Sequence, residues 1–206
     1  MYFRSGEIQS QMRRNAPDDL VLPYTRTMMD FLLLRPLPRR IAIIGLGGGS
    51  MPKWCYRRLP QTDITVVEIN PHVIALRSHF LIPGDDARFR VLCEDGARYV
   101  AETAERPDVL IVDGFGADGQ PPELCSQTFY NDCYRALDRE ALIAVNLCGP
   151  RDQLHITRIR QSFQDRALVA TFEDGENKVV FAGKGGGRWP LDKLLFEQVA
   201  PSAKRH

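Results

Sequence analysis

The sequence lacks long apolar runs, an excess of charge of either sign and a basic stripe interleaved with aromatic residues. Its longest apolar stretches, such as FLLL at residues 31–34 and VLIV at 109–112, are far shorter than the roughly 20 residues that a membrane-spanning helix needs. The 27 basic residues nearly balance the 26 acidic ones, giving a net charge of +1. We therefore expect neither a membrane nor a nucleic acid as a partner.

Paired cysteines and metal-ligand spacings are absent as well. The five cysteines form no CxxC pair, and the four histidines show no ligand spacing. The cysteines are therefore expected to be reduced, most of them as small apolar side chains, and no metal site is expected. The N-terminus has no apolar core of the kind found in signal peptides, which favours a cytoplasmic protein.

What the sequence does contain is a regular alternation of strand-like and helix-like segments from residue 40 onward. With 206 residues, 44% of them hydrophobic, the chain can bury one good core. Its strand-like runs are rich in Val, Ile and Leu and keep no clean polar face, which is typical of parallel strands buried on both sides. These runs are residues 40–46, 63–69, 88–94, 108–115 and 141–147.

The end of the chain departs from this alternation. Residues 167–174 and 178–184 flank a short segment, 175–177, and predict an antiparallel hairpin. Helix-length segments separate the earlier strands at about 50–59, 71–80, 95–105, 123–137 and 150–164. The sum predicts an α/β protein with a Rossmann-like class I methyltransferase fold: a mostly parallel seven-stranded sheet that ends in an antiparallel hairpin.

The first 35 residues differ in character from the rest. Residues 2–12 predict a small β-hairpin that turns at Ser5-Gly6, and residues 24–34 predict an apolar helix that leads into the first strand. We therefore divide the chain into residues 1–35, an N-terminal hairpin with a lead-in helix, and residues 36–206, a Rossmann-like domain in which any ligand-binding and catalytic residues are expected. The cluster KGGGR at 184–188 predicts a flexible link before a short amphipathic end helix.

Candidate site residues stand where the predicted parallel strands end, which is where open α/β sheets bind ligands. A glycine-rich turn, GLGGGS, begins at Gly45, and the next three strands are followed by Glu68, Asp95 and Asp113. An acid in such a place can simply cap a helix, and Asp95 is suited to that. Three acids at one edge favour a binding site.

The acids also indicate the kind of ligand. Glu68 lies 23 residues after Gly45, close to the spacing of about 20 for an acid that binds a ribose diol. The turn lacks the third glycine of the dinucleotide fingerprint, and Asp95 and Asp113 would repel a pyrophosphate. A sulfonium nucleoside would instead be attracted by carboxylates. An S-adenosyl compound is therefore favoured over NAD, and an NAD-dependent oxidoreductase is disfavoured.

Several segments together resemble the spermidine synthase family of polyamine aminopropyltransferases. They are IIGLGGGS, VVEINPHVI, EDGARYV and DVLIVDGF, with the FY pair at 129–130, GEIQ at 6–9 and LPYTRTM at 22–28. The resemblance covers about residues 5–185. It implies a transferase of polyamine biosynthesis that moves an aminopropyl group from decarboxylated S-adenosylmethionine to a small amine, with no permanently bound cofactor and a possible homodimer.

The same resemblance assigns roles to particular residues. Asp113 would orient and deprotonate the attacking amine with the help of Tyr24, because a protonated amine is not a nucleophile. On the nucleoside side, Glu68 would hold the ribose, Asp95 and Gly96 the adenine edge, and Gln9 the thioether side. The glycines of the turn, Gly45 and Gly47, would allow close approach of the nucleoside.

Three positions depart from the family pattern. Gly48 stands where the family's GGGDGG loop carries an acid, Gly116 replaces the second acid of the Asp-x-x-Asp motif (Asp118 follows two residues late), and Phe172 replaces a tyrosine. These departures remove groups that would bind the amine substrate, so two alternatives stay open. One is a methyltransferase that uses ordinary S-adenosylmethionine on the same fold. The other is a catalytically weak homologue that binds a nucleoside or a partner protein.

Overall fold

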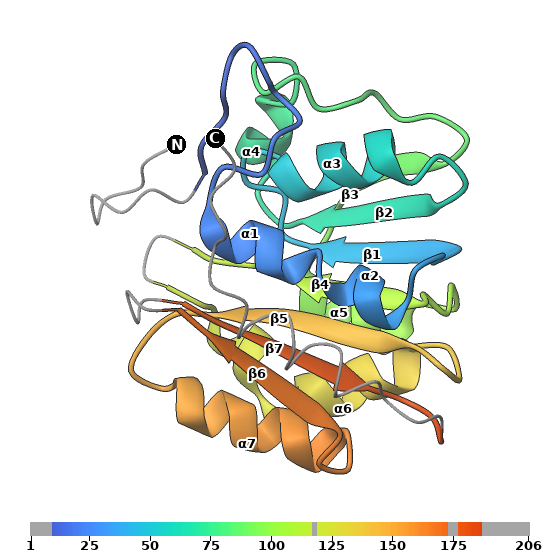
Figure 1. The fold of residues 1–206 in the computed structure, drawn as a ribbon, viewed down its shortest axis with the longest axis vertical. Coiled ribbons are helices and arrows are strands. Elements are labelled where there is room, and N and C mark those ends of the chain that lie inside the picture. Colours follow the sequence, from blue (N-terminus) through green and yellow to red (C-terminus); the bar gives the residue numbers. More distant parts are fainter. Residues whose placement is uncertain (1–9, 117–118, 173–176, 187–206) are drawn as a thin grey trace, which may run out of the picture.

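The protein is built on one twisted seven-stranded sheet with the strand order β3-β2-β1-β4-β5-β7-β6 (Figure 1). The computed structural model describes residues 10–116, 119–172 and 177–186. The strands are β1 (Arg40–Ile44), β2 (Asp63–Glu68), β3 (Phe89–Cys93), β4 (Val109–Val112), β5 (Leu142–Leu147), β6 (Ala167–Thr171) and β7 (Lys178–Gly183). β7 runs antiparallel to its neighbours β5 and β6, whereas the other neighbouring pairs are parallel. The predicted fold is confirmed.

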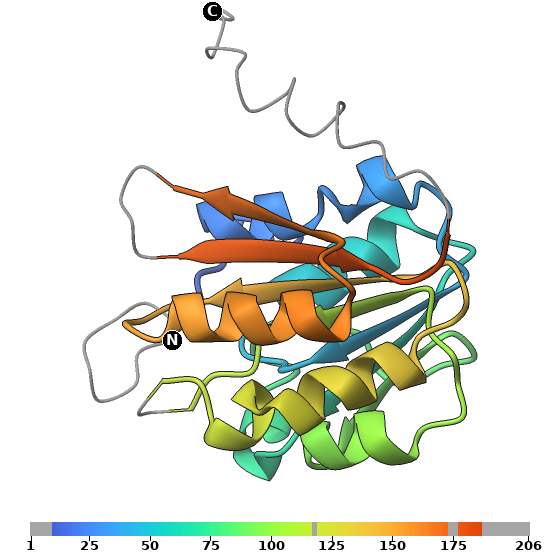
Figure 2. The ribbon, with the colours of Figure 1, turned by 90° about the horizontal axis from the view of Figure 1, so that it is seen from below.

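Helices cover both faces of the sheet, because each central strand is apolar on both sides (Figure 2). The helices are α1 (Pro23–Met28), α2 (Phe31–Leu34), α3 (Ser50–Arg58), α4 (Pro71–Ala75), α5 (Gly96–Glu102), η1 (Pro122–Cys125), α6 (Gln127–Ala136) and α7 (Asp152–Ser162). Successive strand residues point to opposite faces. Ile44 thus packs in the core beneath α5, α6 and α7, and Ile43 in the core beneath α1, α2, α3 and α4.

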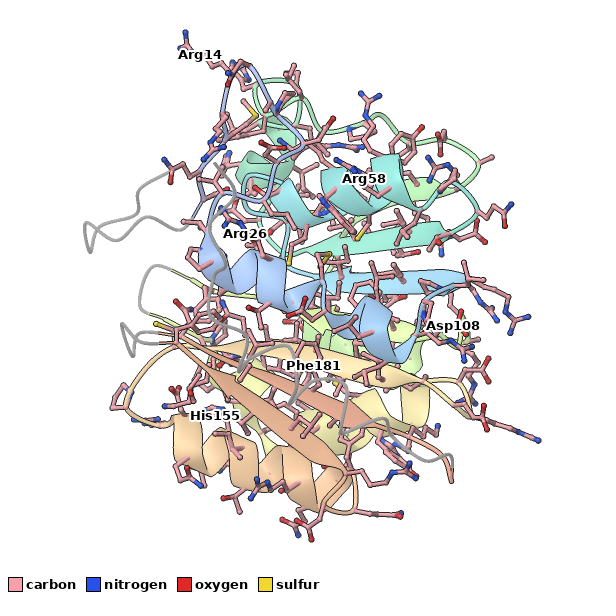
Figure 3. The ribbon with its side chains drawn as sticks, viewed as in Figure 1. Arg14, Arg26, Arg58, Asp108, His155 and Phe181 are labelled. Atoms are coloured by element: carbon pink, nitrogen blue, oxygen red, sulfur yellow. The ribbon has the colours of Figure 1, made fainter. Side chains whose placement is uncertain are left out.

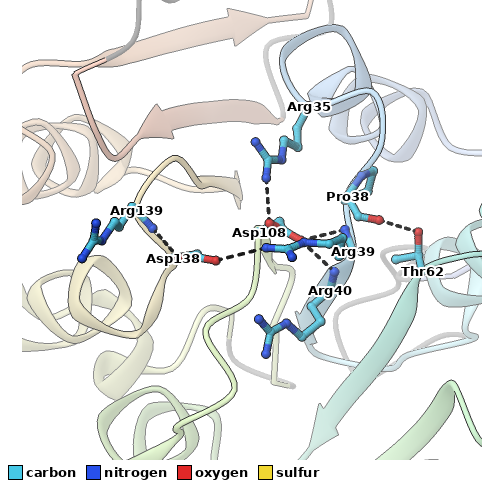
Figure 4. A network of polar contacts seen from close by, with 8 residues as sticks. All are labelled: Arg35, Pro38, Arg39, Arg40, Thr62, Asp108, Asp138 and Arg139. Atoms are coloured by element: carbon cyan, nitrogen blue, oxygen red, sulfur yellow. Dashed lines mark hydrogen bonds and ion pairs between the residues drawn. The ribbon is translucent and has the colours of Figure 1, made fainter.

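A buried acid ties the chain together at the edge where the parallel strands begin (Figures 3 and 4). Asp108, only 1% exposed, accepts hydrogen bonds from the backbone N–H groups of Arg39 (2.7 Å) and Arg40 (2.9 Å) and from the guanidinium of Arg35 (2.8 Å). Burial raises the pKa of Asp108, but these donors outweigh burial, so the pKa lies below its usual value. The contacts join the end of α2, the start of β1 and the start of β4.

The lead-in segment differs from the single predicted helix. Two short helices, α1 and α2, replace it, because the backbone between them forms i→i−3 bonds, from Met29 N to Arg26 O and from Asp30 N to Thr27 O, which tighten the turn. Met28 and Phe31 are fully buried in the same core as the sheet. The predicted N-terminal hairpin and end helix lie largely outside the described residues, and the division at residue 35 stays a prediction.

The other predicted elements are confirmed, apart from two helices and from boundaries that differ by a few residues. The helix predicted over 123–137 is divided at Ser126, whose extended backbone separates η1 from α6. The helix α4 ends at Ala75 instead of about residue 80. Beyond Ala75 the chain continues in turns with i→i−3 bonds, such as that from His79 N to Leu76 O, and reaches Leu81 with a positive φ of 55°. Within the described part of the chain, we find no helix that is long and apolar enough to cross a membrane.

Candidate active site

The candidate site lies at the opposite edge of the sheet, where the parallel strands end. The arrowheads of β1 and β2 point to this edge, on the side where α1 lies (Figure 1). The strand order places the predicted residues along it in a fixed sequence. They are Asp95 after β3, Glu68 in β2, Gly45 after β1 and Asp113 after β4. The topology therefore brings all three predicted acids and the glycine turn to one edge.

Asp113 is held from two sides. Asn146, in β5 and 2% exposed, donates from Nδ2 to Asp113 Oδ1 at 2.8 Å. The hydroxyl of Tyr24, in α1, donates to Asp113 Oδ2 at 3.4 Å. The predicted pair of Tyr24 and Asp113 therefore does meet in space. The longer contact is at Oδ2, so this oxygen is the less firmly occupied one.

The surroundings of Asp113 give it the properties of a base. Burial raises the pKa of its carboxyl to about 7, and the hydrogen bonds from Asn146 and Tyr24 limit the rise. Burial and the neighbouring Asp113 raise the pKa of Tyr24 above its usual value. Tyr24 therefore keeps its proton as a donor near neutral pH. Asp113 can take up a proton there, because a group with a pKa near the working pH is suited to general base catalysis.

Glu68 organises the glycine turn. Its Oε2 accepts from the backbone N–H of Leu46 at 3.0 Å, and its Oε1 accepts from that of Asn70 at 2.9 Å. An ionised carboxylate offers about four acceptor positions, so each oxygen keeps capacity for a ribose hydroxyl. Ile69, the next residue, is 65% exposed and presents an apolar surface beside this acid.

Asp95 caps a helix, as the sequence allowed. Its Oδ1 accepts from the backbone N–H of Arg98 at 2.8 Å, at the start of α5. Gly96 is required by packing, because a Cβ there would lie 2.4 Å from the side chain of Ile44. The cap fixes Asp95 and leaves its second carboxylate oxygen free of this bond.

The glycines of the turn differ in what they do. A Cβ on Gly45, whose φ is +100°, would lie 2.3 Å from the carbonyl oxygen of Asp113, so Gly45 lets β1 and β4 approach each other. A Cβ on Gly47, whose φ is +49°, would meet no atom within 4 Å. Of these two glycines, Gly47 is therefore the one that borders open space where a ligand can approach the backbone.

Gly48, where the family pattern has an acid, has no room for a side chain. A Cβ there would lie 2.2 Å from the Oγ of Ser10 and 3.3 Å from the ring of Phe80. Ser10 itself is 7% exposed. The N-terminal segment thus fills the space next to the turn that an acid at this position would need.

Some predicted features cannot be placed in this geometry. Gln9 and Asp118 lie outside the described residues. Phe172 packs partly buried against the core beneath α1 and α3. In the described segments, no three His, Cys, Asp or Glu side chains gather as a metal-binding group. Three of the five cysteines are buried, whereas Cys93 and Cys148 are exposed.

The sequence reasoning missed two amides next to the base. Asn146 bonds Asp113, and Asn177, which precedes β7, donates from Nδ2 to the Oδ1 of Asn146 at 3.0 Å. A signal for Asn146 was present, because it is the single polar residue within the apolar run 141–147. Asn177 gave none, since polar residues are ordinary in hairpin turns.

Known proteins match the chain over most of its length. A family model described as a spermine/spermidine synthase domain matches residues 22–170. A polyamine aminopropyltransferase of Neisseria meningitidis is 37% identical over 199 residues, covering 94% of this chain and 76% of the relative. The chain belongs to the spermine/spermidine synthase family. The resemblance noted in the sequence is thereby confirmed.

Solved structures share the Rossmann-like fold of this spermine/spermidine synthase family member. Human methyltransferase-like protein 13, solved in complex with SAH, gives a TM-score of 0.75 at 22% identity, covering 85% of this chain and 88% of that one. A spermidine synthase in complex with the transition state analogue AdoDATO gives 0.66 at 24% identity, covering 79% of this chain and 60% of that one. At these identities, the two likenesses establish the fold.

Proposed function

We propose that the protein transfers an aminopropyl group from decarboxylated S-adenosylmethionine to a small polyamine-type amine. The observation that carries the proposal is Asp113, a partly buried carboxyl with a pKa of about 7 at the carboxyl edge of the sheet, beside the glycine turn. Membership of the spermine/spermidine synthase family supports it. The relative from Neisseria bears the name of this activity.

The chemistry needs a base but no covalent enzyme intermediate. The acceptor nitrogen attacks the propyl carbon bonded to the sulfonium, the carbon–sulfur bond breaks, and its electron pair stays on sulfur, which leaves neutral 5′-methylthioadenosine. The nitrogen loses one proton, which Asp113 accepts at Oδ2. The hydroxyl of Tyr24 lies 3.4 Å from this oxygen and can hydrogen-bond either the carboxyl or the incoming amine.

The nucleoside would lie over the glycine turn. Glu68 would accept hydrogen bonds from the ribose hydroxyls, and Asp95 with the backbone of Gly96 would bind the adenine edge. Ile69 offers an exposed apolar surface on which a base ring can pack. Gly47 has no neighbour within 4 Å in the direction of a side chain, so the turn leaves space for the ligand.

Direct assay of transfer tests the proposed function. Purified protein with decarboxylated S-adenosylmethionine and putrescine or spermidine should release 5′-methylthioadenosine and form the longer polyamine, as detected by chromatography. At saturating donor, the rate should rise with pH through about 7, where Asp113 loses its proton. Absence of product with every simple di- and triamine would contradict the proposal.

A second candidate is a methyltransferase that uses ordinary S-adenosylmethionine. The observation in its favour is Gly48, because Ser10 occupies the space that an acid would need. Without an acid at this position, there is less negative charge near the amino-acid part of the donor. The carboxylate of ordinary S-adenosylmethionine is therefore repelled less. Calorimetry separates the candidates: binding of the decarboxylated donor but not of the ordinary one supports aminopropyl transfer, and the reverse supports methyl transfer.

Glu68→Ala is expected to weaken binding of 5′-methylthioadenosine by about 10- to 100-fold. Hydrogen bonds to a charged group contribute roughly 1.5–3 kcal/mol, and each 1.4 kcal/mol changes affinity tenfold. The change also removes the bonds to Leu46 and Asn70 that order the turn. Asp63→Asn, at the exposed opposite end of β2, is the matched control and should leave affinity unchanged. Equal affinity in Glu68→Ala and wild type would remove the ribose assignment.

A further inference from the structure

A chain of two amides runs from the C-terminal hairpin to the candidate base. Asn177 donates to the Oδ1 of Asn146 at 3.0 Å, and Asn146 donates to the Oδ1 of Asp113 at 2.8 Å. Three segments of the chain are thereby linked: the residue before β7, the end of β5 and the residue after β4. The mechanism above does not use Asn177.

The direction of the hydrogen bonds in this chain is fixed by chemistry. An ionised carboxylate only accepts, so the Asn146 amide must turn its NH₂ toward Asp113 when Asp113 is ready to take a proton. The amide oxygen of Asn146 then faces the other way and needs a donor, since Asn146 is 2% exposed and has little access to water. Asn177 supplies that donor. Its own position next to Lys178, which pairs with Leu147 across the two strands, places it beside the end of β5.

We propose that Asn146 and Asn177 position the Asp113 carboxylate, Asn146 by occupying Oδ1 so that Oδ2 receives the proton, and Asn177 by fixing which way the Asn146 amide faces. The proposal rests on the proposed function. Asn177 never needs to touch the substrate: it acts through Asn146, and Asn146 acts through Asp113.

Removal of Asn177 has a defined consequence. The Asn146 amide can then turn over and present its oxygen to Asp113, and an oxygen in that place is compatible only with a protonated carboxyl. The base form of Asp113 becomes less populated. Removal of Asn146 deletes the stronger bond to the carboxylate outright, so its effect has the same direction and is larger.

Other groups around Asp113 do not supply the same control. Tyr24 from α1 contacts Oδ2, and Cys148 directly follows β5. Lys178 lies next to Asn177, but its ammonium pairs with Asp152 Oδ2 at 2.8 Å on α7. Among these contacts, the amide chain is the one that occupies Oδ1.

The test compares Asn146→Leu and Asn177→Ala with wild type in two measurements. The first is the pH profile of kcat/KM for transfer, where the acid limb should move upward by about one pH unit in Asn146→Leu and by about half a unit in Asn177→Ala. One unit corresponds to a tenfold loss of rate below the limb. KM for the decarboxylated donor should stay the same, because neither residue belongs to the nucleoside site. Asn131→Ala, at an exposed position of α6, is the control and should match wild type.

The second measurement does not depend on turnover. Titration of the Asp113 carboxyl carbon by ¹³C NMR should show its midpoint raised in both variants and unchanged in Asn131→Ala. If the midpoint moves although wild type transfers no aminopropyl group, the proposed function fails and the positioning role stands. An unmoved midpoint in Asn177→Ala overturns the role of Asn177, and an unmoved midpoint in both variants overturns the whole proposal. Asn177 is partly exposed, so Asn177→Ala should fold even if Asn146→Leu does not.

Discussion

Asp113→Asn is expected to lower the rate of aminopropyl transfer by about 10²- to 10⁴-fold, the usual contribution of a general base. The amide retains an acceptor oxygen for Asn146, but it cannot take a proton from the amine. Binding of 5′-methylthioadenosine should be nearly unchanged, because the nucleoside contacts lie on Glu68, Asp95 and the glycine turn. Steady-state kinetics and calorimetry measure the two quantities. Glu102→Gln, on the exposed side of α5, removes the same charge elsewhere and should be fully active.

The same substitution should stabilise the folded chain above pH 7. The pKa of Asp113 is about 7 in the fold and 3.8 in the reference state, so the folded state holds its proton more tightly. Wild-type stability therefore falls as pH rises from about 4 to 7, and the full loss is present above pH 7. Its size is roughly 4 kcal/mol, because each pKa unit of difference contributes 1.36 kcal/mol. Urea unfolding at pH 8 should show a stability gain in Asp113→Asn that vanishes near pH 4, and a pH-independent difference would contradict the raised pKa.

Asp108→Ala is expected to reduce the free energy of unfolding by about 3–5 kcal/mol, a typical cost of breaking a buried ion pair. The change leaves the backbone N–H groups of Arg39 and Arg40 and the guanidinium of Arg35 without their acceptor. Chemical denaturation at pH 7 measures the loss. In the wild type, the stability that Asp108 contributes should be lost only at low pH, as the pH falls through the lowered pKa of its carboxyl in the folded state.

A nearby acid provides the control for Asp108. Asp138 forms a 3.7 Å ion pair with Arg39, whose side chain is 72% exposed, and Asp138→Ala should cost less than about 1 kcal/mol. If the two variants lost equal stability, the claim that the buried Asp108 stabilises the fold more than the exposed ion pair of Asp138 would be wrong. Nucleoside binding should be retained by folded Asp108→Ala, because this residue lies at the edge opposite the candidate site.

Much of the fold could be predicted because the signals were local. Short runs rich in Val and Ile, such as residues 63–69, favour a strand buried on both faces. The proline after Asn70 marked the start of a helix. The prediction of a single helix for residues 24–34 was wrong, because the apolar residues of this segment are equally compatible with one helix or with two short ones. The break at Met29 and Asp30 depends on how Met28 and Phe31 pack beneath the sheet, which local pattern does not contain.

The acids of the candidate site were found for a topological reason. In a parallel sheet the residues that follow the strands must share an edge, so Glu68, Asp95 and Asp113 could be grouped without coordinates. Residues next to an antiparallel strand, such as Asn177 before β7, cannot be assigned to this edge in the same way. Asn177 reaches Asn146 because β7 inserts between β5 and β6, and this register could not be read from the sequence. The raised pKa of Asp113 likewise depends on burial in three dimensions.

The contacts of Asp113 have a consequence for the order in which the molecule is completed during its synthesis. Tyr24 comes from an early helix, whereas Asn177 precedes the last described strand of the sheet. While β7 is still inside the ribosome, the parallel strands β1 to β5 and the edge that carries Glu68 and Asp95 have already been synthesised. The contact of Asp113 with Tyr24 can then form, but the amide of Asn146 still lacks the donor from Asn177 that fixes its direction. The nascent protein is therefore expected to hold a nucleoside before its base is fully positioned for transfer.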